Sequence, residues 1–249
     1  MLAVLYIGHG TRLIDGVRQA NQFLYSCMKG ISAPIQEICY LERVQPDIRE
    51  GIRRCIEKGA QIVLIQPLLL LSAGHAKRDI PAVVDEARSL YPDIIFIVGR
   101  PLGVDPKIVD ILIERIFEKR KIIPENSGIV LVGRGSSDPE TKHDFASIRR
   151  LLNERGLNRV LSCYMAAARP SFEEGLDLAL KKGWEQTFVV PYLLFTGVLM
   201  KTLKKAIDLR NKTDTSFVLC SPLGYHPVLI RLMKKRIRES LKNVLPHYT

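Results

Sequence analysis

The sequence contains an internal duplication, and this repeat restricts the fold more than any other feature. ICYLERVQPDIREGIRRCIEKG begins at Ile38, and SCYMAAARPSFEEGLDLALKKG begins at Ser162. Identical residues recur 124 positions apart in these segments: Tyr40 and Tyr164, Pro46 and Pro170, Gly51 and Gly175, and further on Pro67 and Pro191. RPLGVDP and SPLGYHP repeat at a spacing of 121. The repeat predicts two similar domains, residues 1–123 and 124–249, facing each other across a cleft.

Short apolar runs alternate with amphipathic stretches in both halves. Ile48, Ile52 and Cys55 lie on one face of a predicted helix, and a last basic helix is predicted over 226–242. Continuous apolar strands between helices are typical of a parallel sheet that is covered on both faces. Each half is therefore predicted to be an α/β unit with a four-stranded parallel sheet flanked by helices. The predicted strands are Ala3–Ile7, Glu37–Leu41, Ile62–Gln66, Ile94–Val98, Ile129–Val132, Val160–Met165, Thr187–Val190 and Phe217–Cys220.

Composition excludes several classes of protein. The 249 residues are 47% hydrophobic and 25% charged, and no apolar run reaches the roughly 18 to 20 residues of a membrane span. The apolar start, MLAVLYIGHG, lacks the basic beginning and the small-residue cleavage site of a signal peptide, so it is expected to be a strand. The five cysteines are scattered with no CxxC, and Cys39, Cys163 and Cys220 lie in apolar strands. We expect these three to be reduced core residues and the setting to be cytoplasmic.

The net charge of +11 indicates an acidic partner, although it can also serve solubility alone. No nucleic-acid-binding motif is present, and the basic residues are not interleaved with aromatic ones. We therefore expect a polyanionic small molecule, with no nucleic acid and no membrane as partner.

Three residues with metal-binding side chains follow predicted strands of the first copy. His9 lies in GHGTR, Glu42 follows the second strand, and His75 lies in SAGHAK after the third strand. Ligands of open α/β sheets bind beyond the carboxyl ends of the strands. Two histidines and a carboxylate suit a divalent cation such as Fe²⁺, Co²⁺, Ni²⁺ or Zn²⁺. The second copy has lost all three, and their counterparts are Arg134, Ala166 and Leu199.

Each of these residues also has a purely structural interpretation. A histidine at a strand end can simply hydrogen-bond to the backbone, and a glutamate there can be solvated. The pairing of His9 with His75 favours function, because only five histidines occur in the chain. The other three have ordinary roles available at a helix start, within a helix and in the tail: His226, His143 and His247.

GHGTR, YLERVQPD and QPLLLLSAGHAKRDIP resemble the class II chelatases of the sirohydrochlorin type, and the resemblance covers the whole chain. It implies two similar α/β domains that insert a metal into a tetrapyrrole. His9 and His75 would then bind the metal and assist deprotonation, with Glu42 nearby. Fe²⁺ or Co²⁺ would be a substrate, and no tightly bound cofactor is expected.

The resemblance also implies a seat for a flat macrocycle with a rim of carboxylates. The predicted substrate contacts are Arg43, Lys77, Arg134, Ser136 and Ser137. The last three belong to the second copy, which would then be the part that binds the macrocycle. Each single cation can instead be a solvated surface charge. A monomer is expected to be self-sufficient because both copies lie in one chain, with a dimer left open.

Sirohydrochlorin ferrochelatase activity, giving sirohaem, is the leading prediction. A cobaltochelatase and a non-catalytic metal or tetrapyrrole carrier are the alternatives. The chain has neither the His-rich tract nor the CxxC segment of longer cobaltochelatases, which favours iron. A histidine phosphatase is a weaker alternative, since Gly8 stands where an RHG motif has the phosphate-binding arginine.

Overall fold

Both faces of the first strand, β1 (Leu2–Gly8), are buried, as the sequence pattern predicts. Ala3, Leu5 and Ile7 pack in one hydrophobic cluster, and the alternate residues Val4 and Tyr6 are buried on the opposite face. The structure is a computed structural model that describes residues 1–72, 74–212 and 217–242, and the side chain of residue 75 lies outside that description.

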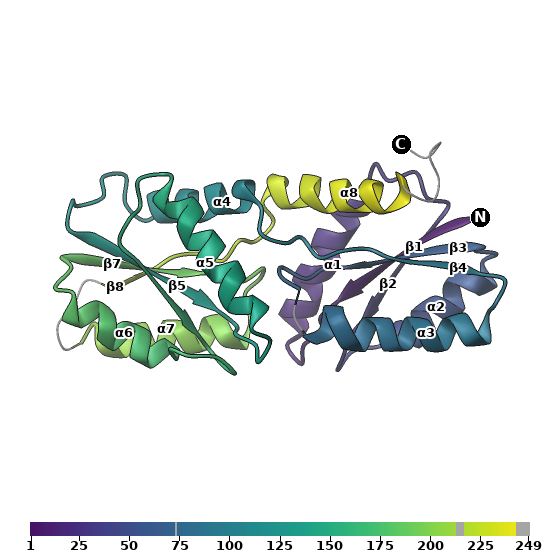
Figure 1. Cartoon of the computed structure of the whole chain (residues 1–249), viewed down its shortest axis with the longest axis horizontal. Coiled ribbons are helices and arrows are strands. Elements are labelled where there is room, and N and C mark those ends of the chain that lie inside the picture. Colours follow the sequence, from purple (N-terminus) through teal and green to yellow (C-terminus); the bar gives the residue numbers. More distant parts are fainter. Residues whose placement is uncertain (73, 213–216, 243–249) are drawn as a thin grey trace. The chain divides into compact units, whose positions relative to one another are not determined.

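The first sheet has four parallel strands in the order β2-β1-β3-β4. Its other strands are β2 (Ile35–Tyr40), β3 (Ile62–Pro67) and β4 (Ile95–Val98). The helices α2 and α3 pack on one face, and α1 and α8 contact the sheet as well (Figure 1). Their bounds are α1 (Ile14–Met28), α2 (Ile48–Glu57), α3 (Ile80–Leu90) and α8 (Pro227–Lys242), with a π-helical turn η1 (His75–Asp79) leading into α3.

The second sheet repeats this topology with the parallel order β6-β5-β7-β8. Its strands are β5 (Ser127–Gly133), β6 (Val160–Tyr164), β7 (Gln186–Pro191) and β8 (Phe217–Leu219). Its helices are α4 (Pro106–Phe117), α5 (Glu140–Asn153), α6 (Phe172–Lys181) and α7 (Val198–Arg210). The predicted fold class is confirmed, and the strand predictions agree with the observed bounds to within about two residues.

The compact units differ from the two halves of the sequence. One unit comprises Met1–Gly103 with the segment from Pro227 onward, and the other comprises Val104–His226. The last helix of the first repeat, α4, packs against α5 and β7, whereas α8 of the second repeat packs against α1 and β3. The units therefore differ from the sequence halves 1–123 and 124–249 by an exchange of these two helices.

Equivalent arginines hold the two loops at which the chain passes from one unit to the other. In the first unit, Arg236 of α8 donates from Nε and Nη2 to the carbonyl oxygen of Leu102, at 3.1 and 2.6 Å. In the second unit, Arg115 of α4 donates from Nε to Pro222 O at 3.0 Å and from Nη2 to Leu223 O at 2.7 Å. The spacing that pairs the two PLG motifs thus also pairs these arginines.

Candidate functional site

The strands that lead into the candidate site all end at the carboxyl edge of the first sheet. β1 lies between β2 and β3, and the register places Gly8 beside Tyr40 and Ile7 beside Pro67. Since all strands are parallel, the segments that carry His9 and Glu42 leave the sheet at the same carboxyl edge. This arrangement was predicted from the sequence pattern.

The backbone pairing between β1 and β2 continues into the site. The Leu41 amide donates to Gly8 O at 2.9 Å, and the Glu42 amide donates to His9 O at 3.2 Å. These bonds bring the side chains together, with Nδ1 of His9 3.5 Å from Oε1 of Glu42. About a third of each side chain is exposed (34% and 36%), and pairs so accessible contribute roughly 0–1 kcal/mol. The contact therefore orients the imidazole more than it stabilises the fold.

The surroundings of the His9 ring favour one tautomer. Nδ1 faces two acceptors, the Glu42 carboxylate and Gly10 O at 3.1 Å, while Nε2 is buried. A proton on Nδ1 can be donated to Gly10 O, lies next to the Glu42 carboxylate, and leaves the lone pair on Nε2. A carboxylate or carbonyl at one ring nitrogen is the usual support for a histidine that binds metal through the other.

Arg43 borders the same carboxylate. Its Nε lies 3.1 Å from Oε1 of Glu42, so this oxygen lies near both the imidazole and a guanidinium. The Arg43 backbone is in the left-handed region, with φ 66°, and its side chain is exposed. Its placement beside Glu42 is consistent with the predicted substrate contact, which stays a prediction.

The glycine after His9 is required by a close approach of two backbones. Gly10 has φ +86°, and a Cβ there would lie 1.8 Å from the carbonyl oxygen of Glu42. Any side chain would push apart the two loops that hold His9 and Glu42. The second glycine of GHG is therefore a structural requirement of the site.

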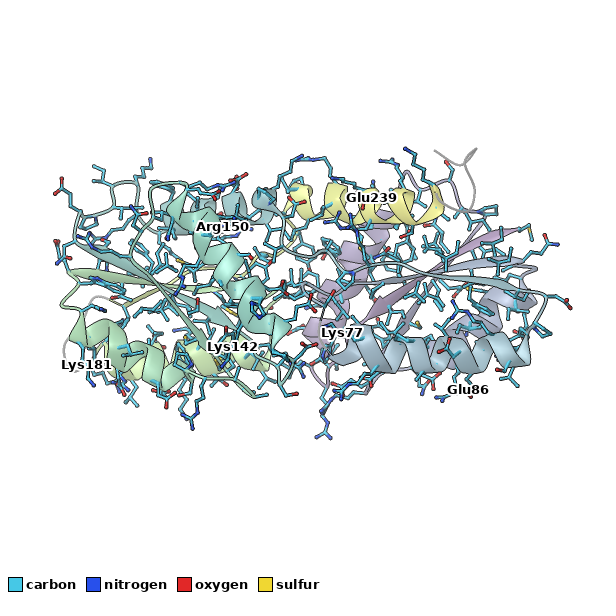
Figure 2. All side chains as sticks on the ribbon, viewed as in Figure 1. Lys77, Glu86, Lys142, Arg150, Lys181 and Glu239 are labelled. Carbon is cyan, nitrogen blue, oxygen red and sulfur yellow. The ribbon has the colours of Figure 1, made fainter. Side chains whose placement is uncertain are left out.

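His75 is the first residue of η1, which follows β3. Its side chain lies outside the described residues, so its convergence with His9 stays a prediction. Among the side chains that are described, no group of three histidines, cysteines or acids could hold a metal. Lys77, labelled in Figure 2, is exposed on the same turn.

The second unit repeats the backbone of the site with other side chains. The Ala166 amide donates to Arg134 O at 2.9 Å, and a Cβ on Gly135 would lie 1.8 Å from Ala166 O. Arg134 and Ala166 therefore occupy the places of His9 and Glu42, as the sequence alignment predicted. Arg134 and Ser137 are exposed. Ser136 instead accepts the Asp138 amide at 3.1 Å, which stabilises its own turn.

A groove beside the site was not predicted. A pocket of about 910 Å³ runs along α1, and Arg12, Arg43 and Asn21 are among its lining residues. The Tyr40 hydroxyl donates to Oδ1 of Asn21, which ties the groove to the end of β2. Burial raises the pKa of Tyr40, and the Asn21 hydrogen bond lowers it. Aligning the loops after His9 and Glu42 with the second repeat shows that Arg12 and Arg43 are replaced there by Ser137 and Ala167, although it does not show that a groove is present.

Across the part of the chain that the structure describes, every helix is too short or too polar to cross a membrane.

The family model CbiX matches this chain twice, over residues 3–119 and 128–240. The chain belongs to the CbiX family. A sirohydrochlorin ferrochelatase from Priestia megaterium is 44% identical over 98% of this CbiX chain and 92% of that protein. A sirohydrochlorin cobaltochelatase from the same organism is 36% identical over 97% of this chain and 81% of that protein.

A solved structure, SirB from Bacillus subtilis with Fe3+, has the same fold as this CbiX chain. Its TM-score is 0.87 at 36% sequence identity, covering 99% of this chain and 98% of that one. The two family matches coincide with the two repeats. The resemblance drawn from GHGTR and its companion motifs is therefore confirmed.

Proposed function

We propose that this protein is a sirohydrochlorin ferrochelatase, which inserts Fe²⁺ into sirohydrochlorin and releases two protons. The observation that carries this is the 44% identity to a sirohydrochlorin ferrochelatase over nearly the whole of both chains. The contacts of the His9 ring with Glu42 and with the Gly10 carbonyl support the same function. The five cysteines are free and buried, which is consistent with a reducing compartment, and we propose that the protein acts in the cytoplasm. We also propose that a single chain is the active form.

The chemistry requires a metal to lose its other ligands while two inner pyrrole nitrogens lose their protons. Neutral imidazole binds Fe²⁺ and also accepts protons near neutral pH. With Nδ1 facing Glu42 and Gly10, we assign Nε2 of His9, which is buried in this structure, as the metal-binding or proton-accepting atom. His75 is proposed as the second ligand, and Glu42 as the group that orients His9 and passes protons to solvent.

The substrate's rim of carboxylates accounts for the positive charge of the chain. We propose that Arg43 and Lys77 in the first unit, and Arg134, Ser136 and Ser137 in the second, contact these carboxylates. Guanidinium groups suit the task because they bind carboxylates through two parallel hydrogen bonds.

A metal-insertion assay tests the proposal. Anaerobic Fe²⁺, sirohydrochlorin and catalytic amounts of protein should give the absorption change of sirohaem over many turnovers. A change that stops at one equivalent would identify a carrier instead. Co²⁺ in competition with Fe²⁺ decides between ferrochelatase and cobaltochelatase, which is a second candidate because of the 36% identical cobaltochelatase.

His9→Ala and His75→Ala should each lower the insertion rate by about 100-fold or more, the range of general acid–base and ligand contributions. The matched control is His143→Ala, which removes an exposed histidine from α5 and should leave the rate unchanged. Normal rates in both site variants, with thermal stability intact, would contradict the assignment of the site.

A further inference from the structure

The groove along α1 lies directly beside the candidate site. Its lining comes from α1, from the loop after His9 and from the loop after Glu42. Thr11 and Arg12 are two and three residues after His9, and Arg43 directly follows Glu42. A ligand in the groove is therefore next to both loops that hold the His9–Glu42 pair.

The groove combines apolar surface with positive charge. Ile14 and Tyr25, at 84% and 56% relative exposure, are large apolar side chains left open to solvent along it. Its cations are Arg12, Arg18, Lys29 and Arg43. Arg18 is paired with Asp15 at 2.5 Å and Arg43 with Glu42 at 3.1 Å, and both pairs are exposed enough for an incoming carboxylate to compete.

The second repeat provides an internal comparison, because its turn matches that of the first. Thr11 accepts the Leu13 amide at 3.2 Å, and Ser136 accepts the Asp138 amide at 3.1 Å, 125 residues later. Arg43 and Ala167 likewise share a left-handed backbone, with φ 66° and 55°. With this alignment, the counterparts of Arg12, Arg18 and Arg43 are Ser137, His143 and Ala167.

At these three positions the cation is present only in the copy that also keeps His9 and Glu42, whereas the second copy has Lys142 and Arg150 at the counterparts of Val17 and Tyr25. The common backbone needs none of them, because the second repeat forms the same turns without them. Selection for folding does not account for this difference, whereas an acidic ligand bound on this side of the first unit does.

We infer that the α1 groove binds the carboxylate-bearing rim of the tetrapyrrole, with Arg12 and Arg43 as its principal contacts. This rests on the proposed function and names residues of the first unit as substrate-specificity determinants. About 910 Å³ is within the usual range of small-molecule sites, and apolar walls with a few cations suit a flat, acidic macrocycle. Arg43 would then contact substrate on one side and Glu42 on the other.

Binding of metal-free sirohydrochlorin to the full chain, followed by fluorescence quenching, tests the inference. Arg12→Ala should raise Kd about tenfold, the size expected for one charge-assisted contact. Arg43→Gly should do the same while retaining the left-handed backbone. The matched control is Arg150→Ala on α5, labelled in Figure 2, which removes another exposed arginine from the counterpart of α1.

A methyl-esterified sirohydrochlorin makes the test specific for carboxylates. It should bind the wild type more weakly than the free acid, and Arg12→Ala should weaken it no further. An unchanged Kd for Arg12→Ala and Arg43→Gly would overturn the groove, as would an equal rise in Arg150→Ala, which would mean general attraction to a cationic chain. Failure of the wild type to bind sirohydrochlorin at all would instead remove the proposed function, and the groove with it.

Discussion

At the scale of residues, the turn after the second strand of each repeat stores backbone strain. Ala167 has φ 55°, a conformation that costs a residue with a Cβ roughly 1–2 kcal/mol. Glycine avoids this cost but loses about 0.5–1 kcal/mol of chain entropy on folding. We expect Ala167→Gly to raise the free energy of unfolding by about 0.5–1 kcal/mol, measured by urea denaturation.

The neighbouring Ala168→Gly is the control, because its φ is not positive and the substitution should destabilise the fold. A loss of stability in both variants would show that the turn is not strained at Ala167. Arg43 has the same backbone strain in the first copy, and there the strained residue borders the candidate site. Strain of this kind collects at functional positions.

The sequence predicts the proximity of His9 and Glu42, which the structure shows, whereas the convergence of His75 with them stays a prediction. Aligning the copies predicted that Arg134 and Ala166 replace His9 and Glu42, and the backbone hydrogen bonds confirm this. The groove could not be predicted in the same way. Its principal cations, Arg12 and Arg43, lie in loops outside the regular elements. An isolated arginine in the sequence is indistinguishable from a solvated charge until the neighbouring elements are in place.

At the scale of elements, the two exchanged helices are held by equivalent arginines. Arg236 is buried, with 6% exposure, and supplies two hydrogen bonds to Leu102 O. Arg236→Met would keep much of the side-chain volume and leave that carbonyl without these donors. We expect a loss of about 2 kcal/mol of unfolding free energy, the cost of an unsatisfied buried polar group.

Arg238→Met, on the exposed side of the same helix, is the control and should change the unfolding free energy by under about 0.5 kcal/mol. Equal effects of the two substitutions would mean that Arg236 acts only through its charge. Arg115→Met offers the corresponding measurement in the second unit, where its guanidinium holds Pro222 and Leu223.

The strands and the basic last helix could be predicted because their apolar patterns are local. The exchange of α4 and α8 could not, because a helix with one apolar face shows only that it covers some sheet. Ile108, Ile111 and Leu112, which recur at helical spacing in the sequence, lie on the buried face of α4. Which sheet they cover depends on the path of the chain after the PLG motifs.

At the scale of the whole molecule, buried thiols make stability depend on alkaline pH. Burial raises the pKa values of Cys27, Cys55, Cys163 and Cys220 from 9.0 to about 12. Their contribution is fully present below pH 9, where the unfolded thiols are also protonated, and is lost as pH rises toward 12. Each thiol lowers the unfolding free energy by up to about 1.4 kcal/mol per pH unit in that window.

Urea unfolding at pH 8 and pH 10.5 measures this loss. Cys220→Ala should make the loss of unfolding free energy between pH 8 and pH 10.5 smaller by the contribution of one thiol. The substitution also removes packing contacts, which lowers the unfolding free energy at both pH values. An unfolding free energy that is the same at both pH values would contradict the buried, protonated state of the cysteines.

The exchanged helices also determine which fragments can fold alone. Residues 104–226 are one continuous compact unit that contains α4, whereas the sequence repeat 124–249 lacks α4 and carries α8, which packs on the other unit. We expect the fragment 104–226 to unfold cooperatively in urea. The fragment 124–249, although a few residues longer, should aggregate or unfold without a sharp transition, because the face of β7 that α4 covers is exposed. If the fragment 124–249 unfolded as cooperatively as 104–226, the exchange of α4 and α8 would not contribute to stability. The sequence halves would then be the folding units.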